Sequence, residues 1–421
     1  MNKVLIGAWP LFFGLALIMV GNGLQGTLLG VRANIEGFST ATTGLVMSLY
    51  YFGFLAGSIA APKLVRNVGH IRVFAALASL ASTTVLLHAI FPSAILWGLV
   101  RIVTGFGFAG LYIVIESWLN GMADNRNRGQ VLGLYILITY GCMAIGQFLL
   151  SVADPSGPAL FILTSVLVSC ALVPISLSKR EAPVLPSSEH VSLKKIYSIS
   201  PLGVIGAFMS GISGGTVFAI GAVFAIQSGM TTLQVSSFMA SIILGGMCFQ
   251  YPVGWISDRI DRRLIIITCA ALASLVAFLC TFFTVGWGLY SMVFIFWGLG
   301  VPIYALSIAY TNDYIEHDQI LAASSSLILL NGAGACIGPL AVTIIMSIFG
   351  PISFFPALSA IFAITCVFAI YRSTVRETVP LEEQGSFVGA PARGAYFVAQ
   401  YAEEEATEEF TEDELKPKTE D

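Results

Sequence analysis

Residues 239–263 read MASIILGGMCFQYPVGWISDRIDRR, an apolar run of helix length that ends in a basic loop. Residues 47–71 read MSLYYFGFLAGSIAAPKLVRNVGHI and follow the same plan 192 positions earlier (239 − 47). One half of the chain therefore repeats the plan of the other. Many membrane transporters are built from two such repeats, with the substrate path between them. The repeat makes transport across a membrane the leading hypothesis.

The composition predicts a membrane protein. Hydrophobic residues make up 56% of the chain and charged residues only 10%, a balance that excludes a soluble globular domain. A helix needs about 20 apolar residues to cross a bilayer core, and runs of this length recur twelve times. The predicted spans are 5–31, 42–65, 71–91, 94–119, 129–151, 158–178, 201–226, 235–257, 263–285, 287–311, 320–349 and 351–371.

The distribution of basic residues predicts the orientation of the chain in the membrane. Of the 20 Lys and Arg residues, Arg101 lies inside a span and Arg32 lies in the connection after the first span. The others all fall on the opposite side of the membrane. Because short loops rich in Lys and Arg stay in the cytoplasm, we expect a multi-pass inner-membrane protein with both termini in the cytoplasm.

The polar segments divide the chain into four parts. Residues 179–200 are the longest polar interruption and carry Pro, Ser and basic residues, so they predict a cytoplasmic linker between two six-helix bundles, 1–178 and 201–377. Residues 378–421 end in an acidic run and predict a disordered cytoplasmic tail. A cytoplasmic partner could dock on this tail.

Motifs at the helix ends resemble a known family. Residues 254–263, GWISDRIDRR, follow the eighth span and are similar to the Gly-xxx-Asp-Arg-x-Gly-x-Arg/Lys signature of the major facilitator superfamily. Residues 101–107, 114–117, 125–129 and 315–319 resemble the YcaD-like bacterial branch of that superfamily. The resemblance covers residues 1 to about 377. It implies an all-α polytopic membrane protein with 12 transmembrane helices in two pseudo-symmetric six-helix bundles.

Charged residues at the cytoplasmic helix ends are candidates for a gate. In the first copy of the signature, Arg66 stands where the family has Asp. The family fold implies that Arg66 faces the start of the eleventh helix and Asp258 the start of the fifth, where opposite charges would latch the outward-facing state. The alternative is that all are ordinary loop charges. The candidate gate residues are Arg66, Arg72, Glu116, Arg126, Arg128, Asp258, Arg259, Arg262, Arg263, Asp313, Glu316 and Asp318.

A polar set inside the spans predicts a substrate cavity. Arg101 is a charge within the fourth span, where a cation is costly unless it faces a cavity or partners, and the resemblance places it at the substrate site or its proton-coupling network. No Asp or Glu falls near the centre of a span, so the sequence does not establish proton coupling. A lone cation favours an anionic or amphoteric solute. The predicted cavity residues are Arg101, Asn22, Gln25, Tyr140, Gln147, Gln250, Tyr304, Ser307 and Asn331; for the uncharged ones the alternative is an interhelical hydrogen bond.

These observations predict a monomeric secondary transporter that moves a small organic solute by alternating access between the two halves. Uptake of a metabolite and efflux of a drug or metabolite both remain open, as does a non-transporting sensor on the same scaffold. The chain lacks the motifs of a membrane-embedded enzyme, and its seven cysteines lie in apolar runs without Cys-x-x-Cys. We therefore expect no enzymatic activity, no cofactor or metal, and no nucleic-acid partner. The expected partners are the small organic solute and the lipid bilayer.

Overall fold

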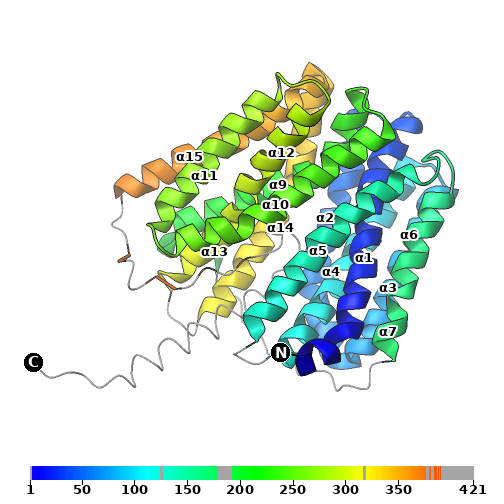
Figure 1. Ribbon diagram of the computed structural model, residues 1–421, viewed down its shortest axis with the longest axis horizontal. Coiled ribbons are helices and arrows are strands. Elements are labelled where there is room, and N and C mark those ends of the chain that lie inside the picture. Colours follow the sequence, from blue (N-terminus) through cyan, green and yellow to red (C-terminus); the bar gives the residue numbers. More distant parts are fainter. Residues whose placement is uncertain are drawn as a thin grey trace, which may run out of the picture.

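The computed structural model describes residues 2–123, 127–177, 192–315, 319–375, 379–380, 384–385, 387 and 389. Within these residues the chain is helical and contains no strands (Figure 1). Twelve helices are long and apolar enough to cross a membrane. They correspond one by one to the twelve predicted spans, so the predicted fold class is confirmed.

Each half of the chain forms one helical bundle. The first half contains α1 (Asn2–Ile35), α2 (Thr40–Val68), α3 (His70–Ile90), α4 (Ala94–Met122), α5 (Arg128–Phe148), α6 (Ala159–Cys170) and α7 (Leu172–Ser176). The second half contains α9 (Pro201–Gln227), α10 (Thr232–Ser257), α11 (Arg262–Cys280), α12 (Trp287–Gly300), α13 (Pro302–Asn312), α14 (Ile320–Phe349) and α15 (Phe354–Val375). A short helix, α8 (Leu193–Ile199), precedes the second half.

Local sequence signals set where the helices begin and end. Ser39 caps α2 by accepting a hydrogen bond from the backbone of Thr42, and Thr231 caps α10 in a capping box with Gln234. The second helix of each bundle thus starts with the same device. The tenth span is divided into α12 and α13 just before Pro302, since a proline removes a helical hydrogen bond.

The internal repeat is visible in the packing of the backbone. Gly53 of α2 lies against the backbone of Ile102 on α4, and Gly245 of α10 lies against the backbone of Phe294 on α12. A side chain at either glycine would collide with main-chain atoms. Both residues of the second contact lie 192 positions after those of the first (245 − 53 and 294 − 102), the same offset as in the sequence repeat.

A second pair of glycine contacts repeats at the same offset. Gly146 of α5 lies against the carbonyl of Val20 on α1, and Gly338 of α14 lies against the carbonyl of Ile212 on α9. Small residues permit this close approach of membrane helices. The two bundles therefore share not only their helix order but also individual contacts between backbones.

The two bundles touch at one end and separate at the other. We call the end that holds Gly69, Ala123 and Asp258 the basic end, and the end that holds Gly37 and Gly229 the opposite end. The two halves contact each other at the opposite end. The halves diverge toward the basic end, where a cavity of about 500 Å³ opens between α5 and α10. Figure 1 shows α5 and α10 side by side, one from each bundle.

Hydrogen bonds close the opposite end. The Oγ of Ser236 on α10 donates to the carbonyl of Gln147 on α5 over 2.8 Å, and the Nε2 of Gln227 donates to the Oγ1 of Thr40 over 3.0 Å. Gly30 of α1 packs against the side chains of Ala222 and Val223 on α9. Every one of these contacts joins the first half to the second.

Candidate functional site

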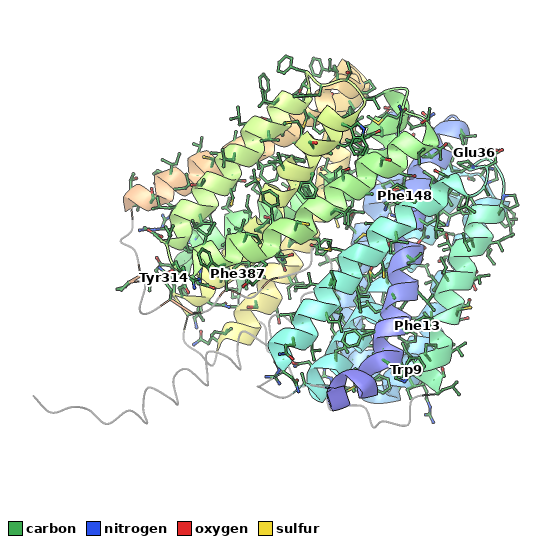
Figure 2. All side chains as sticks on the ribbon, in the orientation of Figure 1. Trp9, Phe13, Glu36, Phe148, Tyr314 and Phe387 are labelled. Carbon is green, nitrogen blue, oxygen red and sulfur yellow. The ribbon has the colours of Figure 1, made fainter. Side chains whose placement is uncertain are left out.

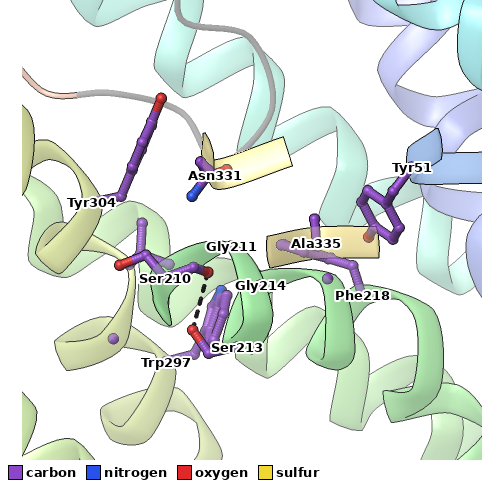
Figure 3. A pocket seen from close by; sticks show the side chains of 13 residues that line it. Tyr51, Ser210, Gly211, Ser213, Gly214, Phe218, Trp297, Tyr304, Asn331 and Ala335 are labelled. Carbon is purple, nitrogen blue, oxygen red and sulfur yellow. Dashed lines mark hydrogen bonds between the residues drawn. The ribbon is translucent and has the colours of Figure 1, made fainter. Parts of the chain in front are cut away.

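A small cavity lies where the two bundles meet in the middle of the fold. We call it the central cavity (Figure 3). Its volume is about 30 Å³, which corresponds to a single water molecule. The first half contributes Tyr51 from α2. The second half contributes the remaining lining side chains, chiefly Ser210, Ser213, Phe218, Trp297, Tyr304 and Asn331.

The central cavity is aromatic and polar, and none of its described lining residues is charged. The rings of Phe218 and Trp297 meet edge to face with centroids 5.8 Å apart. The Oγ of Ser213 donates to the carbonyl of Ser210 over 3.1 Å (Figure 3). Aromatic faces around a few polar groups are typical of a site for a small organic ligand.

Two polar atoms of the lining residues have no hydrogen-bond partner within the described part of the chain. They are the Oγ of Ser210 and the Nε1 of Trp297, both buried. Buried donors without a partner are costly, so they are available to a solute in an enlarged cavity. Asn331 differs, because its Nδ2 donates to the carbonyl of Ala207 on α9 over 3.0 Å.

The structure places three of the predicted cavity residues near the junction of the halves. Tyr304 and Asn331 line the central cavity, and Gln250 lines the cavity between α5 and α10 at the basic end. Ser307 lies one turn beyond Tyr304, where its Oγ donates to the carbonyl of Ile303 over 2.6 Å and contacts Gly206. Ser307 therefore joins α13 to α9.

Arg101 lies inside the first bundle. Its guanidinium is 4.3 Å from the ring centroid of Tyr50 on α2, in a cation–π contact, and its side chain is only 5% exposed. It does not line the central cavity or the basic-end cavity. The anchor for an anionic solute that the sequence suggested is thus not in the central cavity.

Four other predicted cavity residues also lie within the first bundle. Asn22 donates to the hydroxyl of Tyr112, and the Nε2 of Gln147 donates to the carbonyl of Gly23 over 2.9 Å. These bonds hold α1 against α4 and α5. Gln25 and Tyr140 are buried. The placement of Asn22 and Gln147 agrees with the alternative of interhelical hydrogen bonds.

Sequence reasoning missed most of the central cavity. Tyr51, Phe218 and Trp297 were hidden among many other aromatic residues in apolar spans. The strongest available signal was the run SGISGG at 210–215, which places two hydroxyls among glycines on one helix. Small residues let a ligand or a neighbouring backbone come close, so such a run is a reasonable candidate for a site.

Charged residues at the basic end form pairs inside the second half. The Nη1 of Arg262 lies 2.7 Å from both carboxylate oxygens of Asp313, and the Nη2 of Arg262 lies 3.5 Å from Asp258. Burial raises the pKa of Asp313 to about 6, although the nearby guanidinium of Arg262 opposes this shift. Arg263 pairs with Asp261 over 3.2 Å.

The cross-half contacts predicted for the gate are absent from this conformation of the described residues. Asp258 was expected beside Arg126, which lies outside the described residues, and beside Arg128; it bonds Arg262 and the N–H of Phe387. Asp313 was expected to face Arg66 and pairs with Arg262. The physical reason is that the halves stand apart at the basic end. A latch of the outward-facing state therefore stays a prediction for a different conformation.

The remaining gate residues have different surroundings. Glu116 is buried and accepts a hydrogen bond from the hydroxyl of Tyr135, so it joins α4 to α5. Arg259 lies over the ring of Trp255, 4.0 Å from its centroid. Arg66 and Arg72 are exposed, whereas Arg128 is buried. Arg126, Glu316 and Asp318 lie outside the described residues.

Part of the segment expected to be a disordered tail is bound to the second half. The N–H of Gly385 donates to Asp313, and the Nη2 of Arg262 donates to the carbonyl of Gly385 over 2.7 Å. The expectation of a solvated segment from residue 378 onward therefore does not hold at Gly385 and Phe387. Most of residues 378–421 lies outside the described part of the chain.

Comparisons with known proteins agree with the fold. The model of the Major Facilitator Superfamily matches residues 11–304 and 202–407. The uncharacterized MFS-type transporter YcaD of Escherichia coli O17:K52:H18 is 25% identical over 355 residues, which are 80% of this chain and 88% of the relative.

Solved structures of low sequence identity share the same architecture. The nucleoside transporter NupG has a TM-score of 0.70 at 13% identity and covers 88% of this chain and 98% of its own. A bacterial homolog of the human lysosomal transporter Spinster, in an inward-facing and unoccupied conformation, has a TM-score of 0.64 at 14% identity, with coverage of 95% and 97%. These likenesses concern the fold alone.

Proposed function

Because this chain belongs to the Major Facilitator Superfamily, in its YcaD-like branch, we propose that it moves a small organic solute across the membrane by alternating access between its two bundles. The observation that carries this proposal is the central cavity between the bundles, together with hydrogen bonds that join the halves at the opposite end and the larger cavity that parts α5 from α10 at the basic end. A solute path needs a site between two gates of which only one is open.

The closed gate consists of contacts that a rocking motion would have to break. Ser236 with Gln147 and Gln227 with Thr40 hold α10 and α9 to the first half by single hydrogen bonds. A net ~1 kcal/mol for each such bond is small enough for two conformations to interconvert. Apolar contacts such as Gly30 with Ala222 can separate without leaving a charged group unpaired.

The distribution of Lys and Arg supports an assignment of the basic end, and of both termini, to the cytoplasm. On this assignment the structure is an inward-open state. The outward-open state would form when the basic ends of α5 and α10 approach each other and the opposite ends part. The predicted pairs of Arg66 and Asp258 with the other half would form in that state.

The chemistry of the central cavity supports a neutral, polar solute that carries a ring. Four aromatic side chains offer stacking surfaces, namely Tyr51, Phe218, Trp297 and Tyr304, and Ser210 and Trp297 offer free buried donors. A fixed net charge on the solute would have no counter-charge among the described lining residues. An Arg101 that faced the cavity would favour an anionic solute instead.

Ligand-dependent stabilisation tests this site across many candidate solutes at once. A compound that binds only the folded protein raises its melting temperature, so the purified protein is screened against neutral polar heterocycles, sugars and amphoteric metabolites. Trp297→Phe keeps an aromatic ring but removes the Nε1 donor, and we expect it to lose most of the stabilisation by each hit. Trp287→Phe is the matched control, because Trp287 is 87% exposed.

Counterflow of each hit in proteoliposomes then tests transport itself, with and without an imposed pH gradient to test proton coupling. Transport predicts uptake that Trp297→Phe reduces and Trp287→Phe leaves unchanged. Binding without counterflow in any condition would favour the sensor. Equal stabilisation of Trp297→Phe and the wild type by all hits would show that the central cavity is not the solute site.

A further inference from the structure

Residues Gly385, Phe387 and Gly389 follow the last helix, and Phe387 and Gly389 line the cavity between α5 and α10. Two of them are held through their main chain. Arg262 donates to the carbonyl of Gly385 over 2.7 Å, and Asp313 accepts from the N–H of Gly385 over 3.2 Å. Asp258 accepts from the N–H of Phe387 over 2.8 Å. The ion pair Arg262–Asp313 therefore forms one half of a peptide-binding site.

The side of α10 provides a seat for the ring of Phe387. Gly254 lies directly beneath this ring, and a Cβ at position 254 would collide with its atoms. Figure 2 labels Phe387 at the basic end of the second bundle. The seat exists because position 254 lacks a side chain.

The segment also reaches the first half. The α-carbon of Gly389 lies where a Cβ would be 3.4 Å from the Cδ1 of Ile136 on α5 and 3.5 Å from the Cγ of Gln250 on α10. Phe387 and Gly389 line the same cavity as Gly133 of α5 and Gln250. The segment thus stands between the two helices that must approach for the basic end to close.

We propose that Gly385, Phe387 and Gly389 belong to an intramolecular stopper, bound in a peptide groove formed by Arg262, Asp313, Asp258 and Gly254, that holds the basic end open. This inference rests on the proposed alternating access, since an open state needs holding only if a closed one exists. The segment has to leave the groove before α5 and α10 can meet at this end. The charged group that faces both carboxylates of the groove is Arg262 of α11, 2.7 Å from Asp313 and 3.5 Å from Asp258.

A disulfide between the segment and α10 tests the docked position. Gly389→Cys and Gln250→Cys are combined in a background whose seven native cysteines are replaced by serine or alanine. Oxidation should join them, because a Cβ at position 389 would lie 3.5 Å from the Cγ of Gln250, the position that the Sγ of a cysteine at 250 would take. Adding Gly254→Leu fills the seat of Phe387 and should abolish the cross-link. Adding Gly141→Leu is the matched control, since Gly141 of α5 has open space within 4 Å and does not line this cavity, and should leave the cross-link intact.

Spin labels test whether the docked segment holds the basic end open. Labels at Gln130→Cys and Ile260→Cys mark the basic ends of the two halves, and full-length protein should give one long distance. Gly254→Leu, and independently truncation after residue 383, should each add a shorter distance, whereas Gly141→Leu should not. Unchanged distances in both release variants would overturn the stopper, as would a cross-link that survives Gly254→Leu.

The two readouts separate this inference from the proposed transport. A cross-link that depends on Gly254, together with short distances in the release variants, supports the stopper whether or not a solute is found. A protein that shows neither a second distance in any variant nor counterflow of any ligand would contradict alternating access as well. Loss of counterflow alone would contradict only the proposed transport.

Discussion

Arg262 and Asp313 form a buried ion pair at the basic end, in which the Nη1 of Arg262 lies 2.7 Å from each carboxylate oxygen and the two side chains are 1% and 3% exposed. The pair lies entirely within the second bundle and joins the start of α11 to the residue after α13. It also binds the backbone of Gly385. One ion pair therefore connects the stability of a bundle with the position of the chain's end.

Arg262→Met should destabilise the protein, because it leaves the buried carboxylate of Asp313 without its counter-charge. Removal of one partner of a buried pair costs about 3–5 kcal/mol, and adding Asp313→Asn should restore much of the loss. Arg263→Met is the control. Its partner Asp261 is 26% exposed, so we expect ~0–1 kcal/mol.

Thermal unfolding of purified protein in one detergent measures these differences. A double variant less stable than Arg262→Met alone would contradict an unpaired carboxylate as the cause. Equal losses of stability in Arg262→Met and Arg263→Met would show that burial of the Arg262–Asp313 pair does not increase its contribution to stability.

The melting temperature should depend on pH through Asp313. Burial raises its pKa from 3.8 to about 6, so the folded protein binds this proton more tightly than the unfolded chain. The stability due to protonation is fully present below pH 3.8 and is lost as the pH rises through about 6. We expect the wild type to lose stability relative to Asp313→Asn between about pH 4.5 and about pH 7. A difference that is constant over this window, or of opposite sign, would refute the raised pKa.

The repeated glycine contacts should be equally intolerant of a side chain. Gly53→Ala and Gly245→Ala each place a Cβ against the backbone of a neighbouring helix, and overpacking of this kind costs about 1–3 kcal/mol. Gly141→Ala on α5 meets open space and should stabilise its helix by about 0.5–1 kcal/mol. Losses in only one of the first two variants would show that the two bundles are not packed alike.

Closure of the opposite end should weaken when the bond between the halves is removed. Ser236→Ala eliminates the hydrogen bond to Gln147, a contribution of about 1 kcal/mol, which should raise the open population about fivefold. Ser237→Ala is the control, since the Oγ of Ser237 bonds only to its own helix, at Leu233.

Labelling of a cysteine at position 222, which is buried against Gly30, reports this opening. With Ala222→Cys in a cysteine-depleted background, Ser236→Ala should speed the reaction with a water-soluble maleimide. Equal labelling rates with Ser236→Ala and Ser237→Ala would mean that the bond does not contribute to closure.

The sequence predicted the architecture well because span length, hydropathy and loop charge are local properties. The run 239–263 and its counterpart 47–71 identified the repeat, and the structure shows the same repeat in the contacts of Gly53 and Gly245. The domain bounds at 178, 201 and 377 stay predictions, as does the cytoplasmic side of the termini.

The site was much harder to predict, because the side on which a polar residue of a membrane helix faces depends on tertiary packing. Arg101 and Asn22 contact partners within the first bundle, Tyr50 and Tyr112, which a linear pattern cannot show. The contribution of Phe387 to the basic end was equally invisible, since its seat depends on the missing side chain of Gly254 on a distant helix.

The most direct test of alternating access is a pair of distances measured on one protein. Spin labels at Gln130→Cys and Ile260→Cys report the basic end, and labels at Val152→Cys and Leu233→Cys report the opposite end. Across the wild type, Gly254→Leu and Ser236→Ala, we expect the two distances to change in opposite directions, one shortening as the other lengthens. Two distances that stay constant, or that lengthen and shorten together, would contradict a transport mechanism based on rocking bundles.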